Sequence, residues 1–199
     1  MLLTLIISLL IANWSNGQNS KKNSEMIIED FKEEEHLDWR IVNDGVMGGL
    51  SSSKLELIED GKALFSGYVS LENNGGFASV RGLLGEKDAS GIDKILIRVK
   101  GDGKKYDLRI RTNRNFDGIS YRVPFKTEKD KWTTHEFFLS DFIPSFRGRK
   151  LKNRPLLTAS EIRQVGILIA DKQVGKFELV IDQIKGVNSS QEKTSTIVD

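Results

Sequence analysis

The chain has 199 residues, of which 38% are hydrophobic and 29% charged, a composition typical of one globular domain and not of a disordered segment. Its formal net charge of +2 is too small to indicate a nucleic-acid-binding protein. It contains no cysteine, which excludes disulfides, cysteine-ligated zinc and thiol nucleophiles, and its two histidines, His36 and His135, lie far apart, so a metal site would need oxygen ligands.

The chain begins with an apolar run, MLLTLIISLLIA, which is too short to span a bilayer and is followed by the small residues Ser15 and Gly17. This pattern predicts a secretory signal peptide over residues 1–17 and therefore an exported protein. No Lys or Arg precedes the run, so an uncleaved membrane anchor is the alternative. A polar linker at 18–25 and a disordered tail at 189–199 would then flank one domain at 26–188.

Within that domain, short runs rich in Val, Ile, Phe and Tyr alternate with a period of two, which predicts β-strands. Asp60-Gly61 and Asp102-Gly103 each separate two such runs and predict two hairpins, because Asp-Gly tolerates positive φ. About ten strands with almost no helix predict an all-β antiparallel sandwich or jelly roll. The predicted strands cover residues 26–31, 39–42, 54–58, 62–71, 77–82, 94–101, 105–112, 120–125, 132–139, 163–170 and 176–187.

The same alternation assigns side chains to the two faces of each strand. In the strand at 105–112, Leu108 and Ile110 share one face, and Asp107, Arg109 and Arg111 share the other. Because the apolar pair must face the core, the arginines are predicted to point outward. In the strand at 77–82 the small apolar residues are predicted to pack inward, which leaves Phe77 and Arg81 on an outer surface.

If these strands are neighbours, one sheet presents a cationic outer face formed by Arg81, Arg109, Arg111 and Arg122. Such a face suits an acidic protein surface or an anionic glycan. The alternative is an ordinary solvated face, neutralised by carboxylates such as Asp107. A basic segment at 146–154 lies in a long connection, where it is either a solvated loop or the closure of one end of a groove.

Two segments, WRIVNDGVMGGLSSS at 39–53 and LENNGGFASVRG at 71–82, place Asn, Asp and paired glycines between apolar residues. They lack the Gly-Lys-Ser/Thr of a phosphate-binding loop, the dinucleotide fingerprint and the GxSxG of a nucleophile elbow. Paired carboxylates for glycoside hydrolysis could be drawn from Asp38, Asp44 or Glu72, but any chain of this acidity offers such pairs. The prediction is therefore a protein that is not an enzyme.

The order of motifs resembles the family of complex I intermediate-associated proteins. The resemblance implies a galactose-binding-domain-like jelly roll and a non-catalytic, chaperone-like role in assembling a protein complex. A secreted carbohydrate-binding module that uses the face of the jelly roll is the alternative. The matching segments are DF (30–31), W-x-x-x-ND-x-VMGG-x-S (39–51), F-x-G (65–67), L-x-NNGGF-x-S-x-R (71–81), GDG (101–103), FRGR (146–149) and G-x-x-x-x-D-x-x-x-G-x-F (166–177).

The predicted partner is a protein, or an anionic or neutral glycan, bound by a monomer. The residues predicted to line one face or its rim are Asn43, Asp44, Asn73, Asn74, Phe77, Arg81, Arg109, Arg111, Arg147 and Arg149. A structural role is predicted for Trp39, Met47, Gly48, Gly49, Gly75 and Gly76. No cofactor is expected apart from a candidate structural calcium ion, for which Asp30 and Asp182 are the candidate ligands.

Overall fold

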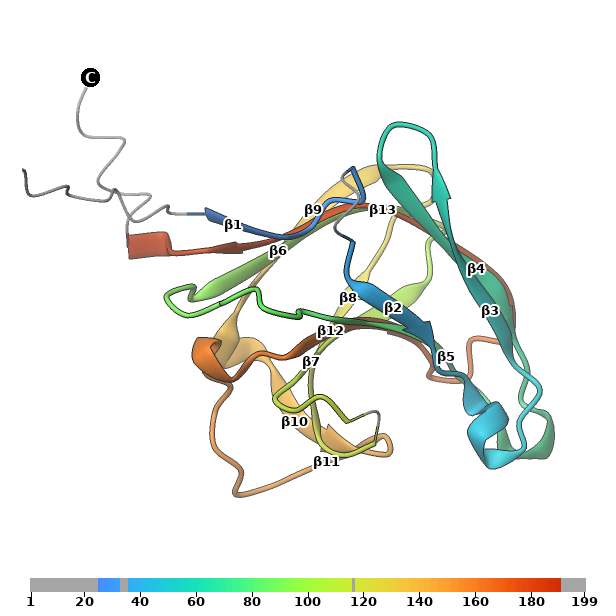
Figure 1. The fold of residues 1–199 in the computed structure, drawn as a ribbon. Coiled ribbons are helices and arrows are strands. Elements are labelled where there is room, and N and C mark those ends of the chain that lie inside the picture. The colour runs from blue at the N-terminus through green and yellow to red at the C-terminus, as the bar shows by residue number, and fades with distance from the viewer. Residues whose placement is uncertain (1–24, 33–35, 116, 191–199) are drawn as a thin grey trace, which may run out of the picture.

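The computed structural model describes residues 25–32, 36–115 and 117–190, which form two antiparallel sheets packed face to face (Figure 1). Sheet A has the strand order β3-β4-β13-β6-β9, with β1 also paired to β13, and sheet B has the order β11-β10-β8-β7-β12-β5-β2. The predicted all-β sandwich is therefore confirmed, with thirteen strands among the described residues.

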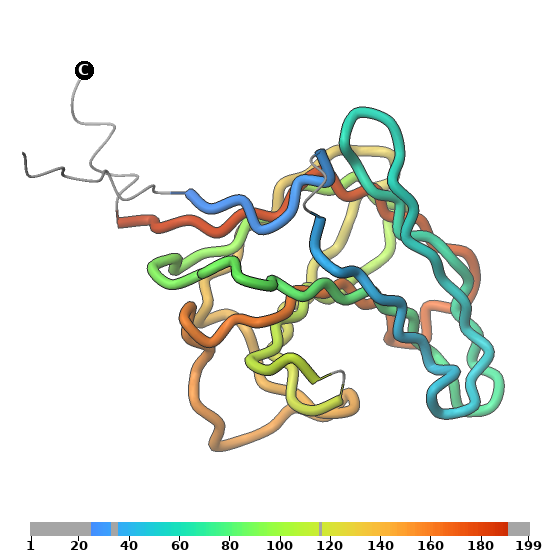
Figure 2. Tube along the Cα trace, in the orientation of Figure 1, coloured from blue at the N-terminus to red at the C-terminus, as the bar shows by residue number. Residues whose placement is uncertain are grey.

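The first and last of these strands, β1 and β13, pair antiparallel and lie side by side (Figure 2). The strands of sheet A are β1 (Glu25–Glu29), β3 (Ser52–Ile58), β4 (Lys62–Val69), β6 (Lys94–Gly101), β9 (Trp132–Phe138) and β13 (Gly175–Val187). Those of sheet B are β2 (Asp38–Ile41), β5 (Ala78–Leu83), β7 (Lys105–Arg111), β8 (Ser120–Lys126), β10 (Ile143–Phe146), β11 (Arg149–Lys150) and β12 (Gln164–Ile169). Short 3-10 turns connect them, namely η1 (Asp44–Met47), η2 (Glu72–Asn74), η3 (Leu139–Asp141) and η4 (Ala159–Glu161).

The core lies between the sheets and is built from alternate residues of the central strands. In β7, Leu108 and Ile110 are fully buried, and each such side chain contributes about 1.5–3 kcal/mol relative to an exposed one. In β13 the pairing register with β6 shifts between Ile181 and Gln183. This bulge changes the phase of the strand, so that Ile181 and Ile184 are both fully buried although their spacing does not fit a regular strand.

One of the two predicted hairpins is wrong. Asp60-Gly61 joins β3 to β4 in sheet A, as predicted, but Asp102-Gly103 joins β6 in sheet A to β7 in sheet B. The Asp102 carboxylate accepts hydrogen bonds from the backbone N–H groups of Lys104 (3.0 Å) and Glu178 (3.0 Å) and so fixes the crossing. Turn chemistry reverses the chain, but it does not decide whether the second strand stays in the same sheet.

The basic segment after residue 143 contains two strands that the sequence did not predict. Phe146 pairs with Arg149, and the two residues between them, Arg147 and Gly148, both have positive φ. That is the backbone of a tight hairpin turn, in which Asn or Asp usually precedes the Gly. Because arginine stands there, the sequence pattern indicated a loop, whereas the structure adds β10 and β11 to the edge of sheet B.

Candidate binding site on the outer face of sheet B

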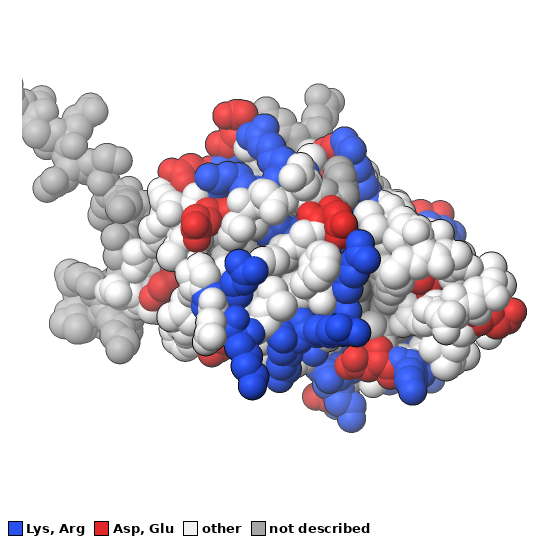
Figure 3. All heavy atoms as spheres, turned by 90° about the horizontal axis from the view of Figure 1, so that it is seen from below, with Lys and Arg blue, Asp and Glu red and all other residues white. Residues whose placement is uncertain are grey.

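Arginines from four strands of sheet B, β2, β5, β7 and β8, form a row across its outer face, and the strand β12 between β5 and β7 contributes a glycine to the same row. Arg40 pairs with Arg81, Arg81 with Gly166, Gly166 with Arg109, and Arg109 with Arg122. Because directly paired residues project to the same side of a sheet, all four arginines lie on one face. We call the part of this face formed by Arg81, Arg109, Arg111 and Arg122 the arginine face. Figure 3 shows Lys and Arg side chains gathered on this side of the molecule.

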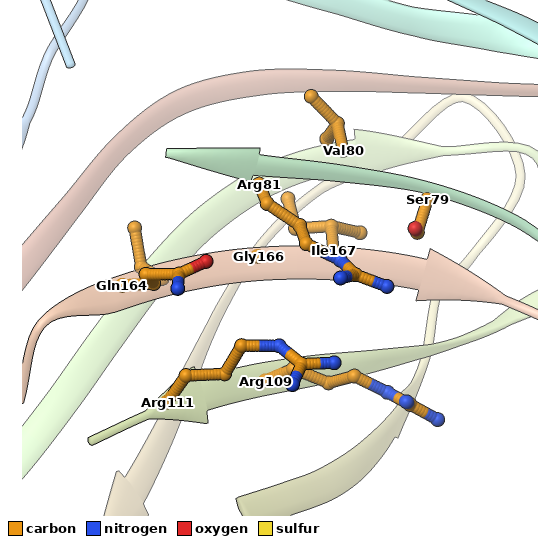
Figure 4. Close-up of a pocket in the computed structure, with 9 residues that line it drawn as sticks. Ser79, Val80, Arg81, Arg109, Arg111, Gln164, Gly166 and Ile167 are labelled. Atoms are coloured by element: carbon orange, nitrogen blue, oxygen red, sulfur yellow. The ribbon is translucent and has the colours of Figure 1, made fainter. Parts of the chain in front are cut away.

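A small notch is hollowed into the arginine face above β12. Figure 4 shows the side chain of Arg81, from β5, lying over β12, with Arg109 and Arg111 on the neighbouring strand β7. The notch has a volume of about 10 Å³, which is room for about one water-sized group. Its lining consists of Ser79, Val80, Arg81, Arg109, Arg111, Gln164, Val165, Gly166 and Ile167.

The cations of the notch are poorly hydrated and repel one another. Burial, followed by the charges of Arg111 and Arg109, lowers the pKa of Arg81 to about 10. Burial is also the main cause that lowers the pKa of Arg109 and of Arg111, in each case with a smaller contribution from a neighbouring guanidinium. Such crowding of like charges is unfavourable, and it is typical of a site that receives an anion.

Asp107 supplies the buried negative charge beside this cluster. It is 5% exposed, and its Oδ2 accepts hydrogen bonds from Arg109 (3.2 Å) and Arg122 (3.1 Å). Arg111 instead donates to the backbone oxygen of Gly118 at 2.9 Å. The sequence-based alternative, a face neutralised by Asp107, thus applies to Arg109 and Arg122, whereas Arg111 donates to a backbone carbonyl and is acted on by the charge of Asp117.

Asp44 was predicted to touch a partner, and the structure corrects this assignment. Its side chain is 0% exposed and accepts hydrogen bonds from Ser51 N (2.9 Å), Gly76 N (2.6 Å) and Phe77 N (3.1 Å), and from the Ser51 hydroxyl. Burial alone would raise the pKa of Asp44, but these hydrogen bonds together lower it. The carboxylate therefore joins the two glycine-rich segments and is not available to a ligand.

The glycines around Asp44 stand at positions where a side chain would be strained or would meet the Asp44 carboxylate. Gly48 adopts a positive φ of 88° and caps η1, which only glycine does without cost. A Cβ atom at Gly49 would lie 2.5 Å from the Asp44 carboxyl carbon, and one at Gly75 would lie 2.7 Å from its Oδ2. The segments 39–53 and 71–82 are thus two halves of one loop cluster packed around a buried carboxylate.

The remaining predicted contacts of this cluster lie away from the notch. Asn43 accepts hydrogen bonds from Ser53 Oγ (2.8 Å) and Ser79 N (3.2 Å), so its side-chain oxygen is already engaged. Asn73 and Asn74 are exposed residues with positive φ in the η2 turn, and Phe77 is half-buried. Trp39 donates its indole N–H to Glu29 Oε2 at 2.8 Å, whereas Met47 is 57% exposed.

The two arginines of the basic segment, Arg147 and Arg149, lie at different distances from the arginine face. Arg147 lies 3.4 Å from Asp117 Oδ2, and the charge of Asp117 also acts on Arg81 and Arg111. Arg147 therefore lies next to the rim of the arginine face. Arg149 is exposed on β11 at the sheet edge and is not part of the notch lining.

The calcium candidates do not fit a cation site. Asp182 is 2.6 Å from Arg98 Nη1, so its charge is already balanced, and Asp30 accepts the backbone N–H of Lys32. Among the described residues, no three His, Cys, Asp or Glu side chains gather where they could hold a metal ion. Calcium needs several oxygen ligands together, so these two aspartates are not a suitable donor set.

Sequence reasoning missed Gln164 and Gly166, which form the floor of the notch. Gln164 is 1% exposed and donates through Nε2 to the carbonyls of Asn113 (2.7 Å) and Asn115 (2.9 Å). Both residues lie in a run that reads as a core strand, RQVGILIA. The sequence does contain a pattern that indicates their position. Gln164 and Gly166 alternate with Val165 and Ile167, so they lie on the opposite face of β12 from the core, although both faces of this strand are buried.

Comparisons of the sequence identify related proteins. The family model described as Complex I intermediate-associated protein 30 matches residues 29–181. An uncharacterised protein of Schizosaccharomyces pombe is 31% identical over 174 residues, covering 75% of this chain and 78% of that protein. The mitochondrial complex I intermediate-associated protein 30 of Drosophila melanogaster is 26% identical, and that of Mus musculus is 28% identical. The alignments cover 79% and 84% of this chain, but only 61% and 60% of those two relatives.

Several solved structures that resemble this one are carbohydrate-binding modules. A family 11 module of Clostridium thermocellum, in complex with a β-1,3-1,4-mixed-linked tetrasaccharide, has a TM-score of 0.61 at 20% identity and matches 82% of this chain and 95% of its own. A mutant family 29 module has a TM-score of 0.51 at 10% identity and matches 82% and 91%. At such low identity these similarities establish a jelly-roll fold and nothing further.

The relatives contradict the predicted export. The proteins of fly and mouse are both described as mitochondrial, so the assignment of a secreted protein is wrong. A short apolar run followed by small residues is a weak signal, and here it lacked the preceding Lys or Arg. Residues 1–17 lie outside the described part of the chain. Among the described residues, no helix is long and apolar enough to span a membrane.

The family match extends from the last residue of β1 into β13, across both sheets, and the chain belongs to the complex I intermediate-associated protein 30 family.

Proposed function

We propose that this chain is a non-catalytic assembly module that associates with a protein partner in a complex I intermediate, using its arginine face. The observation that carries the proposal is the family match over residues 29–181, which includes every strand of the arginine face from β2 to β12. Relatives of this family are named for their association with complex I intermediates. A mitochondrial location follows from the same names as part of the proposal.

The chemistry of the notch supports a binding role and not a catalytic one. The described residues that line it include no His, Asp or Glu that could act as a general base. The hydroxyl of Ser79, the one nucleophile type in the lining, donates to the backbone oxygen of Val42. His135 of β9 shares a hydrogen bond of 3.0 Å with Thr133, and its ring lies beside Phe125 of sheet B and Phe137 of sheet A.

The experiment is a rescue and co-migration assay in cells that lack the endogenous family member. The chain is expressed with a mitochondrial targeting sequence and an affinity tag, and native gels follow its migration with complex I subunits. We expect co-migration with assembly intermediates and recovery of assembled complex I. Recovery with the Arg81→Gln, Arg111→Gln variant equal to that of the unsubstituted chain would exclude the arginine face, and no co-migration at all would exclude the assembly role.

Carbohydrate binding is the second candidate, because the sandwich resembles a module solved with a tetrasaccharide. Among the residues that the structure describes, the notch lining contains no aromatic ring on which a sugar could stack, and the notch volume of about 10 Å³ is too small for a hexose. Titration of the β-1,3-1,4-linked tetrasaccharide by calorimetry tests this candidate directly. Saturable binding that survives the Arg81→Gln substitution would favour it over the assembly role.

A further inference from the structure

We propose that β9, an edge strand of sheet A, is the pairing surface for a second copy of this chain, and that the two copies join their sheets across a two-fold axis at Thr134. This inference goes beyond the proposed function, because the arginine face belongs to sheet B and takes no part in the pairing. Three observations on the described residues carry it, namely the open edge of β9, the backbone donors along that edge, and the opposite charges at its two ends.

The edge of β9 is regular and unprotected. Among the described residues, β6 is the only strand that pairs with β9, and their register runs without a bulge from Trp132 to Phe138. A long edge strand is a template for another chain unless proline, lysine or a bulge protects it. In sheet B, the part of β8 that extends beyond β10 carries Pro124, which has no backbone N–H. β9 contains neither proline nor lysine.

The backbone N–H groups of every second residue of β9 point away from β6. Leu139 donates its N–H to the carbonyl of Asp93 at 2.9 Å and continues the ladder with β6, whereas Phe138 donates to Asp141 Oδ2 at 2.9 Å. Because donors alternate along an antiparallel strand, the residues at even positions face the open edge. The Asp141 carboxylate already accepts the last of these donors. The other outward donors belong to Trp132, Thr134 and Glu136.

A register centred on Thr134 uses these three positions and no others. It places Thr134 opposite its own copy and Trp132 opposite Glu136 of the second copy, and threonine pairs across strands are favourable. A register centred on His135 would need the N–H of Phe138, which Asp141 already accepts. A register centred on Glu136 would place two carboxylates directly opposite each other, which is destabilising.

Opposite charges flank the two ends of this edge on the outer face of sheet A. The Arg98 guanidinium carbon lies 4.5 Å from the centre of the Trp132 ring, and the Lys100 ammonium nitrogen lies 5.7 Å from it. The other end carries the Glu136 carboxylate. In the two-fold register the Glu136 carboxylate of each copy therefore meets the cationic end of the other copy. The edge is complementary to itself, and for this reason its occupant is a second copy.

The contact does not depend on a missing counter-charge. Arg98 contacts Asp182 at 2.6 Å, and Glu136 contacts Lys94 at 2.9 Å. The side chains of Arg98 and Glu136 are nevertheless 38% and 54% exposed, so each is able to join a second ion pair. Pairing along one edge buries little surface, and we therefore expect a dimer that forms at micromolar concentration and dissociates on dilution.

The test measures the mass of the full chain by analytical ultracentrifugation over a range of concentrations, where we expect a monomer–dimer equilibrium. Glu136→Lys should weaken dimerisation at least about tenfold, because it places like charges together at two symmetric positions. Glu56→Lys is the matched control. Glu56 lies on β3, the opposite edge strand of sheet A, is 48% exposed and also contacts a lysine, so its substitution should have no effect.

Single-cysteine variants test the register, because the chain has no cysteine of its own. On oxidation, Thr134→Cys should give a disulfide-linked dimer, since residues directly opposite in an antiparallel pair have Cα atoms about 5.5 Å apart. Phe138→Cys, on the same strand and 49% exposed, should not link, because its two copies would lie at opposite ends of the paired region. Circular dichroism checks that each variant is folded.

A chain that stays monomeric up to a concentration on the order of 1 mM would overturn the inference. Equal effects of the Glu136 and Glu56 substitutions, or equal cross-linking at residues 134 and 138, would also overturn it. The outcome is separable from the assembly role. Native-gel co-migration of a monomeric chain would reject this inference alone, whereas a dimer that does not co-migrate with assembly intermediates would reject the assembly role alone.

Discussion

Buried carboxylates hold the loops and the arginine face of this protein in place, each by accepting several hydrogen bonds. Glu29 accepts from the backbone of Asp30, Phe31 and Leu37 and from the indole of Trp39. Asp44 accepts hydrogen bonds from the backbone of both glycine-rich segments, and Asp107 accepts them from the side chains of two arginines. The free energy of unfolding should therefore be unusually sensitive to single substitutions at these acids.

Asp44→Asn is expected to lower the free energy of unfolding by about 3 kcal/mol, since an amide nitrogen would face backbone N–H donors in a fully buried site. Urea unfolding followed by tryptophan fluorescence measures the change. Asp60→Asn, at a side chain 86% exposed in the β3–β4 turn, is the control and should alter stability by less than about 0.5 kcal/mol. Equal effects of the two substitutions would show that the hydrogen bonds of Asp44 are not stabilising.

The same carboxylate predicts an acid dependence. The pKa of Asp44 is lower in the folded protein than its ordinary value of 3.8, so its contribution to stability is complete above that value and is lost as the pH falls through the lowered folded-state pKa. The stability difference between the wild-type chain and Asp44→Asn should be constant from pH 7 to about 5 and should shrink below about pH 4. Urea unfolding at each pH tests this, and a difference that grows on acidification would contradict it.

Asp107→Asn removes the buried negative charge that Arg109 and Arg122 share. We expect unfolding to become easier by about 3 kcal/mol, because two poorly exposed guanidinium groups would lose their counter-charge. Arg81→Gln should have the opposite sign and stabilise by about 1 kcal/mol, since it relieves repulsion within the cluster. Thermal unfolding of both variants provides the comparison, and a stabilising Asp107→Asn would refute this account of the face.

At the scale of single elements, close approach between strands decides which positions tolerate substitution. β4 lies between the edge strand β3 and β13 in sheet A, and its Gly67 pairs with residues of both. A Cβ atom there would lie 2.1 Å from the backbone oxygen of Ser52 and 3.0 Å from a ring carbon of Phe177. The F-x-G pattern at 65–67 thus has a packing reason, because the glycine gives β3 and the Phe177 ring room to approach.

Gly67→Ala is accordingly expected to destabilise the protein by about 2 kcal/mol, because backbone atoms and a core ring must move to accept the methyl group. Gly45→Ala is the matched control, since a Cβ atom at Gly45 would meet nothing within 4 Å, and it should change stability by less than about 0.5 kcal/mol. Differential scanning calorimetry measures both. A neutral Gly67→Ala would mean that β3 can shift without cost.

Across the whole molecule, a small net charge conceals an uneven distribution. The chain as a whole carries only +2, yet one face of sheet B gathers Arg81, Arg109, Arg111 and Arg122 beside the buried carboxylate of Asp107. Local charge, and not the total, therefore decides which ligands this face can attract.

Binding of an acidic partner should consequently depend on salt. Raising the NaCl concentration from about 50 mM to about 500 mM is expected to weaken binding of an acidic protein partner about tenfold, because the Debye length falls to a few ångströms. Titrations at several salt concentrations with the wild-type chain measure the slope, and Arg81→Gln should make it shallower. Salt-independent binding would indicate an apolar contact in place of the arginine face.

The sequence alone was sufficient to predict the fold class and which arginines lie on the outer face of sheet B. Strict alternation of apolar and polar residues in β7 placed Arg109 and Arg111 outside, and that prediction agrees with the structure. Local patterns succeed here because the side-chain direction in a strand has a period of two wherever one face is buried. They also identified the glycine pairs as architectural, since a positive φ and close contact are properties of the backbone.

Only the tertiary structure decided which strands are neighbours and which polar groups can still bind a ligand. The Asp102-Gly103 turn leads into the opposite sheet, and the Asp44 carboxylate already accepts hydrogen bonds from residues 51 and 76–77. Gln164 and Gly166 became part of a site only when β12 was placed between β5 and β7. Strand order and hydrogen-bond partners depend on contacts between segments that are distant in the sequence, and a local pattern does not encode such contacts. These contacts therefore decide which residues come together to form the site.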